Sequence, residues 1–106
     1  MSTTFKEHIA KSRRLAVLRL LRDNGNSANE SVLHSACLAL GFPTTSRDDV
    51  RSDLEWLKEH RLVTIDNFNK PAGGIIMIST ITAAGIDASR GRGDPIEGLA
   101  RSEYPE

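Results

Sequence analysis

Hydrophobic and polar positions follow two different periods along this chain, and the change falls near residue 62. Before it, apolar residues recur with helical spacing in three segments. The first, residues 5–23, is rich in good helix formers and lacks Pro and Gly. Its apolar positions at residues 15–21 cover most of the circumference, which predicts a helix that packs on several sides or also contacts a second chain. Gly25 suits the left-handed residue that follows a helix.

A second helix is predicted to begin between Ser27 and Asn29 and to close at Gly41. Ser27 and Glu30 have the spacing of a capping box, whereas Asn29 is a competing N-cap. The following apolar positions form a helical stripe: Val32, Leu33, Ala36, Cys37 and Leu40.

A third helix is predicted to start at Ser46 or Thr45 and to run to about residue 60. Val50, Leu54 and Leu57 lie within about 60° of one another on the helical wheel and form its core face. Trp56 points well off that face. It either covers a neighbouring element or is exposed, and the sequence leaves both alternatives open.

After residue 62 the pattern is that of strands. Residues 62–65 and 75–81 are rich in β-branched side chains, and residues 66–74 between them carry the Asn, Pro and Gly of a hairpin loop. Thr82 can cap a short helix over residues 83–89. The repeated Gly and Pro after Arg90 predict a flexible C-terminal tail over residues 90–106.

This order predicts a mostly α fold with a β-hairpin, a winged helix-turn-helix. It consists of three helices, a two-stranded wing and a short C-terminal helix, within a domain of residues 1–89. A chain of 106 residues is the length of one such domain.

The overall charge gives no direct sign of a partner, because 14 basic residues balance 14 acidic ones. No apolar run approaches the ~18 residues that span a bilayer, and the N-terminus does not resemble a signal peptide. The single cysteine, Cys37, fits a reducing compartment. We therefore expect a cytoplasmic protein without a membrane partner.

Locally, positive charge is concentrated in residues 1–25, which hold six basic and two acidic residues. Its strongest cluster is Lys6, Lys11, Arg13 and Arg14. This cluster could clamp DNA phosphates or bind an acidic partner, or it could be a solvated helix face.

The third helix is where a winged-helix protein usually reads the major groove of DNA. Hydroxyls and backbone amides of Thr45 and Ser46 at its start could hold a phosphate. Arg47 and Arg51 could reach guanine edges or the DNA backbone. Together with Lys58 they lie within about 40° of each other on the wheel and form a basic stripe.

Two observations weigh against DNA binding. The face opposite the core is acidic, with Asp48, Glu55 and Glu59, and would repel phosphate or simply be solvated. The wing tip carries one positive charge, Lys70, which could contact DNA or lie on an ordinary solvated loop.

Signs of catalysis and cofactor binding are lacking. His34 and Cys37 have a metal-ligand spacing, but no further ligand matches them, and a free Cys on an apolar stripe is usually a buried hydrophobe. No nucleophile–base set and no glycine-rich phosphate loop is visible. We expect no enzyme and no cofactor.

Two motifs resemble those of winged-helix regulators. The exit of the third helix, Leu54-x-x-Leu57-x-x-x-Arg61-Leu62-Val63, is similar to their Leu-x-x-Leu-x-x-x-Gly-Leu-Val, with Arg61 in the place of Gly. The segment Ile81-Thr82-Ala-Ala-Gly85 is similar to their Leu-Thr-x-x-Gly turn after the wing.

The whole of residues 5–90 resembles the small ArsR-like winged-helix proteins of Mu-like phages and prophages. The resemblance is carried by Arg13-Arg14-Leu15 with Leu18, Asn29-Glu30-Ser31-Val32-Leu33 and Arg47-Asp48-x-Val50-Arg51-x-Asp53-Leu54-x-Trp56-Leu57. It implies a phage or prophage origin and action in the cytoplasm of a bacterial host cell. The metal sensing of some ArsR members does not transfer, because their helix-borne Cys pair is absent.

Two functions follow as hypotheses. The first is a phage-encoded transcriptional regulator or accessory factor that binds duplex DNA through the third helix and the wing. The alternative is a protein-interaction adaptor in phage assembly or DNA packaging, with a phage protein as partner and Trp56 as its anchor if that side chain is exposed. The broadly apolar first helix also suggests a homodimer.

Overall fold

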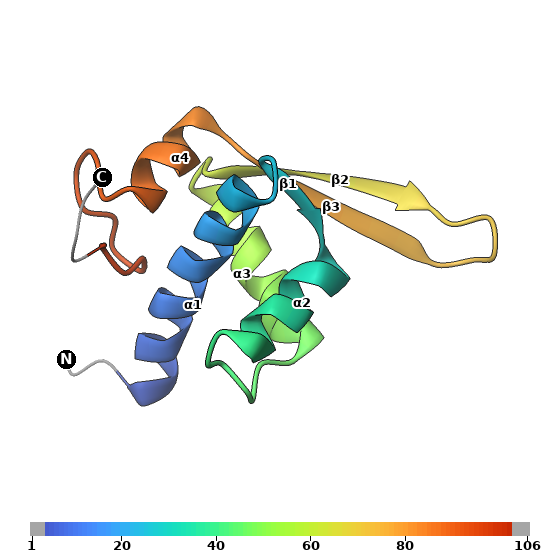
Figure 1. Cartoon of the computed structure of the whole chain (residues 1–106), viewed down its shortest axis with the longest axis horizontal. Helices are drawn as coiled ribbons and strands as arrows, with labels where there is room; N and C mark the ends of the chain where they lie inside the picture. Colours follow the sequence, from blue (N-terminus) through green and yellow to red (C-terminus); the bar gives the residue numbers. More distant parts are fainter. Residues whose placement is uncertain (1–3, 103–106) are drawn as a thin grey trace.

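Four helices and a three-stranded antiparallel sheet make up residues 4–102, the part of the chain that the computed structural model describes. The elements follow in the order α1 (Phe5–Asp23), β1 (Ser27–Asn29), α2 (Glu30–Ala39), α3 (Arg47–Glu59), β2 (Val63–Asn69), β3 (Ile75–Ile81) and α4 (Ala83–Ser89). Strands β2 and β3 form a long hairpin that projects from the helices and lies along the molecule's longest dimension (Figure 1). The fold is therefore mixed α/β, with the predicted helices and hairpin present.

The third strand corrects the sequence-based prediction of a two-stranded sheet. Ser27 was expected at a helix start, but Ser27–Asn29 is β1, which pairs antiparallel with β3 to give the order β1-β3-β2. A strand of three residues has no periodicity of its own. It forms because β3 offers an open edge, and because its central residue, Ala28, is buried there.

Side-chain caps fix where the helices begin. Asn29, and not Ser27, caps α2, because its Oδ1 accepts a hydrogen bond of 2.8 Å from the Val32 N–H. Ser46 caps α3, and Thr82 caps α4 as predicted.

All four helices end at a residue with positive φ that follows the C-cap. After α1, α2 and α4 this residue is glycine: Gly25, Gly41 and Gly91. After α3 it is Arg61, with φ 61°. The Leu62 N–H donates to the Leu57 carbonyl over 2.9 Å and completes the turn. The exit that winged-helix regulators make with glycine is thus made here by an arginine in the left-handed region.

The second motif, Ile81-Thr82-Ala-Ala-Gly85, requires its glycine for close packing. A Cβ at this position would lie 2.1 Å from the Leu62 carbonyl oxygen, so only glycine lets the start of α4 pack this closely on the chain before β2. The Gly85 N–H also donates to the Thr82 hydroxyl over 3.1 Å, which closes the cap.

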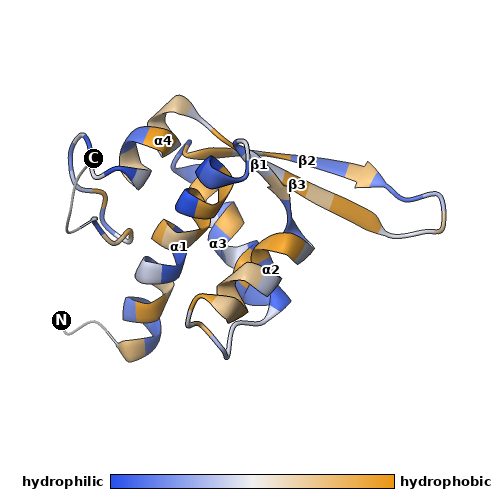
Figure 2. Ribbon diagram, in the orientation of Figure 1, coloured by the Kyte–Doolittle hydropathy of each residue, from blue (hydrophilic) through white to orange (hydrophobic). Residues whose placement is uncertain are grey.

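The core lies where α1, α2 and α3 meet the base of the sheet. Hydrophobic residues line these helix contacts and continue along β3 beyond the helices (Figure 2). The most deeply buried hydrophobic side chains are Val17, Leu18, Leu21, Leu33, Cys37, Val50, Leu54 and Leu57.

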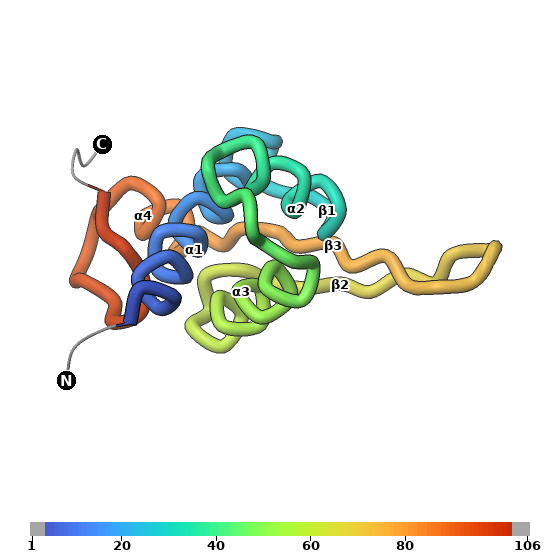
Figure 3. Tube along the Cα trace, turned by 90° about the horizontal axis from the view of Figure 1, so that it is seen from below, coloured from blue at the N-terminus to red at the C-terminus, as the bar shows by residue number. Residues whose placement is uncertain are grey.

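The C-terminal segment, residues 90–102, differs from the expected flexible tail. It packs beside α1 (Figure 3), with Ile96 and Leu99 against the core. Arg14 donates to the Gly98 carbonyl over 2.8 Å, and Arg19 donates to the Ser102 hydroxyl over 2.9 Å. Gly and Pro prevent regular structure in this segment, but guanidinium donors from α1 hold it in place. The rest of the predicted tail, residues 103–106, lies outside the described residues.

Candidate nucleic-acid interface

The residues at the start of α3 build the helix cap. Thr45 is buried, and its carbonyl oxygen lies 2.8 Å from His34 Nε2. Ser46 and Asp49 form a capping box, in which each side chain accepts a hydrogen bond from the other's backbone N–H, at 3.0 and 2.9 Å. The side-chain oxygen of Ser46 is thus already occupied. These two residues position α3, and the Ser46 hydroxyl and N–H are used within the cap.

Arg47 and Arg51 meet on one carboxylate. Arg47 Nε lies 3.2 Å from Glu30 Oε1, and Arg51 Nε lies 2.9 Å from Glu30 Oε2. Both arginine side chains are 54% exposed, whereas that of Glu30 is 6% exposed. The hydrogen bond and charge of Glu30 raise the pKa of Arg51. One buried carboxylate therefore orients two surface guanidinium groups.

This arginine pair lies on the side of the molecule from which the hairpin projects. Glu30 and Arg47 are the first residues of α2 and α3, and the amino ends of both helices point toward the hairpin side (Figures 1 and 3). Helix amino ends carry partial positive charge. The pair is thus placed where an anion is favoured.

The predicted basic stripe along α3 is not continuous. Lys58 is exposed, but it lies about 10 Å along the helix axis from Arg51, near the other end of α3. Between and beside them the surface is mixed, because Asp48, Glu55 and Glu59 are exposed as expected. Asp48 Oδ1 lies 3.9 Å from Arg51 Nη1.

The hairpin presents more apolar than basic surface. Lys70 is exposed at the tip, where its N–H donates to the Gly74 carbonyl over 2.9 Å. Phe68 and Ile75, near the tip, are 53% and 65% exposed. They belong to neighbouring cross-strand pairs and so lie on opposite faces of the hairpin. The sequence analysis placed Phe68 in the loop of residues 66–74, whereas β2 extends to Asn69 and carries Phe68 on the projecting hairpin.

Arg13 and Arg14 require a correction, because the expected cationic cluster on α1 is not a solvated face at these two positions. Arg13 is buried and forms an ion pair with Asp53 of α3, with Nη2 3.1 Å from Oδ1. Arg14 Nε lies 3.4 Å from the same carboxylate, whose side chain is 1% exposed. Both arginines hold α1 against α3, because a carboxylate this deeply buried requires opposite charge nearby.

Trp56 is half-buried and covers neighbouring elements. The Arg14 guanidinium carbon lies 4.5 Å from the centre of the Trp56 ring, and the His60 ring stacks on it at 3.7 Å between centroids. Gly98 touches it from the C-terminal segment. Trp56 therefore belongs to the helix interface and is not an open anchor.

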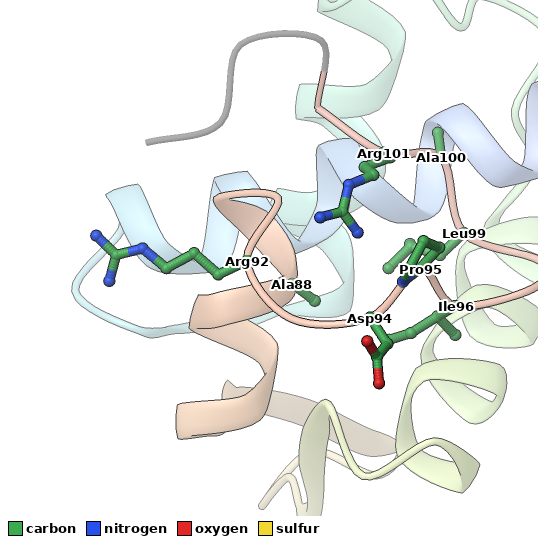
Figure 4. Close-up of a pocket in the computed structure, with 8 residues that line it drawn as sticks. All are labelled: Ala88, Arg92, Asp94, Pro95, Ile96, Leu99, Ala100 and Arg101. Atoms are coloured by element: carbon green, nitrogen blue, oxygen red, sulfur yellow. The ribbon is translucent and has the colours of Figure 1, made fainter.

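Hollows of very different size occur in the described residues, from an open groove along α1 of about 810 Å³ to a much smaller one near the C-terminus. A hollow beneath the C-terminal segment has a volume of about 20 Å³, enough for one water (Figure 4). Arg92 and Asp94 at its edge point away from it (Figure 4). Within residues 4–102 no group of three His, Cys, Asp or Glu side chains could hold a metal ion, and no helix is long and apolar enough to cross a membrane.

Similarity to known proteins shows the family of this chain. No protein-family model matches it. An uncharacterized protein of Escherichia phage Mu, gp26, is 40% identical over 84 residues, which make up 79% of this chain and 81% of gp26. The chain belongs to the gp26 family. The expected association with Mu-like phages is thereby confirmed.

A second gp26-like relative is bacterial. An uncharacterized protein of Haemophilus influenzae is 44% identical over 63 residues, 59% of this chain and 61% of that protein. Neither relative is described as ArsR-like. Proteins similar to this chain thus occur in a phage and in a bacterium.

Proposed function

We propose that this gp26-family protein is a winged helix-turn-helix protein that binds duplex DNA without a cofactor, as a phage regulator or accessory factor. The order of α1, β1, α2, α3 and a terminal hairpin supports this, with β1 pairing on the hairpin strand β3. In the proposed complex α3 enters the major groove by its amino end, and the hairpin contacts the backbone beside it.

The observation that carries the proposal is the sharing of Glu30 by Arg47 and Arg51. Each arginine uses its Nε for Glu30. Arg47 Nη2 also donates to the Ser31 hydroxyl over 2.6 Å, and Arg51 Nη1 lies 3.9 Å from Asp48 Oδ1. A guanidinium group fixed in this way loses less freedom when it binds a guanine edge or a phosphate. Ordinary salt bridges at the surface form between two exposed side chains. A buried carboxylate that is shared by two arginines is a different arrangement, and it fixes the orientation of both guanidinium groups.

The charge balance sets the expected strength of binding. Arg47, Arg51 and Lys70 together neutralise about three phosphates, which corresponds to a slope of about −3 in log affinity against log salt. Glu30 and Asp48 reduce the local positive charge. Binding to random-sequence DNA is therefore weak and rests on the two arginines.

The test is a fluorescence-anisotropy titration with random-sequence duplex DNA at two salt concentrations. Arg47→Ala and Arg51→Ala each lower the affinity by about tenfold. Arg92→Ala is the matched control, because it removes one exposed positive charge from the C-terminal segment, which lies at the end of the molecule opposite the hairpin, and leaves the affinity unchanged. Equal affinity of the two arginine variants and the wild type would remove α3 from the interface.

A second candidate function, a protein-interaction adaptor for a phage protein, is favoured by the hairpin. Exposed Phe68 and Ile75 lie beyond β1, where β3 pairs only with β2. Large exposed apolar side chains on a projecting element are typical of a protein interface. On this hypothesis Phe68→Ser and Ile75→Ser abolish capture of a phage protein that the wild type and Arg47→Ala both retain. Capture that these serine variants leave intact argues against it.

A further inference from the structure

A groove runs along the solvent side of α1. From α1 it is lined by apolar Leu15, Ala16 and Leu20 together with polar residues, and from the end of α2 and the following connector by Leu40 and Phe42. Residues 100–102 of the C-terminal segment complete the lining. Leu40 is 56% exposed, which is unusual for a leucine beside other apolar groups. The groove is therefore an apolar surface without a covering element in residues 4–102.

The polar residues of α1 along this groove are arranged symmetrically about its centre. His8 and Asp23 lie at the two ends, Ser12 and Arg19 lie one turn further in, and Leu15 and Ala16 lie in the middle. Consider a second α1 helix packed antiparallel on the first, with the two-fold axis between Leu15 and Ala16. Each residue of this row then faces the residue at the mirrored position of the other helix. An interface between two identical surfaces must be self-complementary in this way.

Each pair in this arrangement is chemically matched. His8 faces Asp23 of the second copy, so an imidazole N–H can donate to a carboxylate. Arg19 faces Ser12, and its guanidinium retains donors beyond the Nη2–H that it gives to Ser102. Leu15, which is only 6% exposed, and the small Ala16 lie nearest the two-fold axis, so no large side chain projects there to keep the helices apart.

We propose that two copies of this protein associate through the α1 groove as an antiparallel, two-fold symmetric dimer. Like charges do not meet in this register, and every polar residue of the row has a partner. Accessible apolar side chains of the groove, above all Leu40 at 56% exposure, supply the area that is removed from water. This inference stands apart from DNA binding, because it uses none of the residues of the arginine pair or the hairpin.

The test is the molecular mass in sedimentation equilibrium, combined with a charge exchange. The wild type sediments at twice the monomer mass of 11.6 kDa at a concentration of about 100 μM. His8→Asp places two pairs of carboxylates in contact, and Asp23→His places two pairs of imidazoles in contact. Each single variant raises the dissociation constant by about tenfold. The double variant H8D/D23H restores opposite partners and returns it to within about twofold of the wild type.

Val32→Asp is the control, because Val32 is an exposed apolar residue of α2 outside the groove. It leaves the dissociation constant unchanged. Three outcomes would overturn the proposal: a monomeric mass at every concentration, a double variant that dimerises as poorly as the single ones while its thermal unfolding is unchanged, or an equal loss of dimer in Val32→Asp. If residues 103–106 or another protein occupy the groove instead, the purified protein has a monomeric mass at every concentration.

Discussion

Arg13 of α1 and Asp53 of α3 form an ion pair inside the protein, 40 residues apart in the chain, with side chains that are 10% and 1% exposed. Burial raises the pKa of Asp53, although Arg13 and Arg14 act in the opposite direction. Burial lowers the pKa of Arg13, but the hydrogen bond and charge of Asp53 outweigh it and the pKa is raised. The Arg13 guanidinium group thus stays charged, and its charged form is stabilised inside the protein by the Asp53 carboxylate.

The first prediction concerns this pair. Asp53→Ala leaves a buried positive charge without its main partner and lowers the free energy of unfolding by about 3–5 kcal/mol, measured by urea denaturation. The double variant R13L/D53L, which removes both charges and fills the space, loses less than the single variant. If Asp53→Ala costs under about 1 kcal/mol, the pair does not hold α1 to α3.

The second prediction concerns the end of α3. Arg61 adopts φ 61°, a region that costs an L-residue energy and suits glycine. Arg61→Gly therefore raises the free energy of unfolding by about 0.5–1 kcal/mol, after allowance for the greater freedom of glycine in the unfolded chain. Gly25→Ala, at the equivalent position after α1, has the opposite sign. A loss of stability in Arg61→Gly would show that the arginine side chain makes an important contact.

The third prediction concerns pH. The pKa of Asp49 is lowered, chiefly by the hydrogen bond from the Ser46 backbone N–H. A lowered folded pKa means that the stabilisation is complete above the unfolded pKa near 3.9 and is lost as pH falls through the folded value. We expect Asp49→Asn to cost about 0.5–1 kcal/mol at pH 7 and less at about pH 3, by thermal unfolding. A cost that is the same at both pH values would contradict the capping role of the carboxylate.

The fourth prediction concerns Cys37. Burial raises the pKa of this thiol to about 11, and the charge of Asp53 adds to the effect while Arg13 opposes it. Because the thiolate is the reactive form, a disulfide reagent at about pH 8 modifies the folded protein only as fast as it unfolds. The same reagent reacts at once in denaturing urea. Rapid reaction in the folded state would mean that the α2 core opens locally.

Local signals predicted the elements that depend on neighbouring residues. The spacing of Val50, Leu54 and Leu57 indicated the core face of α3, and these three side chains are buried. Thr82 and Ser46 were recognised as caps because a capping side chain bonds to its own backbone three residues away. Gly85 was recognised as part of a motif. Glycine is required there because of the Leu62 carbonyl, which is distant in the sequence.

Long-range contacts were not visible in the pattern. Glu30 is the single acidic residue of residues 26–45 and was interpreted as a capping residue, yet it holds two arginines from α3. Asp53 does not belong to the apolar stripe that marks the core face of α3, yet the structure places it in the core beside Arg13. β1 was hidden for the same reason, because its strand exists only through β3.

The sequence by itself determined the succession of helices and strands, the caps and the apolar stripes, because these follow from bonds and periods within a few residues. The tertiary structure decided which charges are open to a partner and which are used within the molecule. The energy between two charges depends on their distance in space and not on their separation in the sequence. A guanidinium group therefore pairs with whichever carboxylate the packing brings near it. For this reason Arg13 is buried and Arg14 partly buried beside Asp53, while Arg47 and Arg51 stay at the surface.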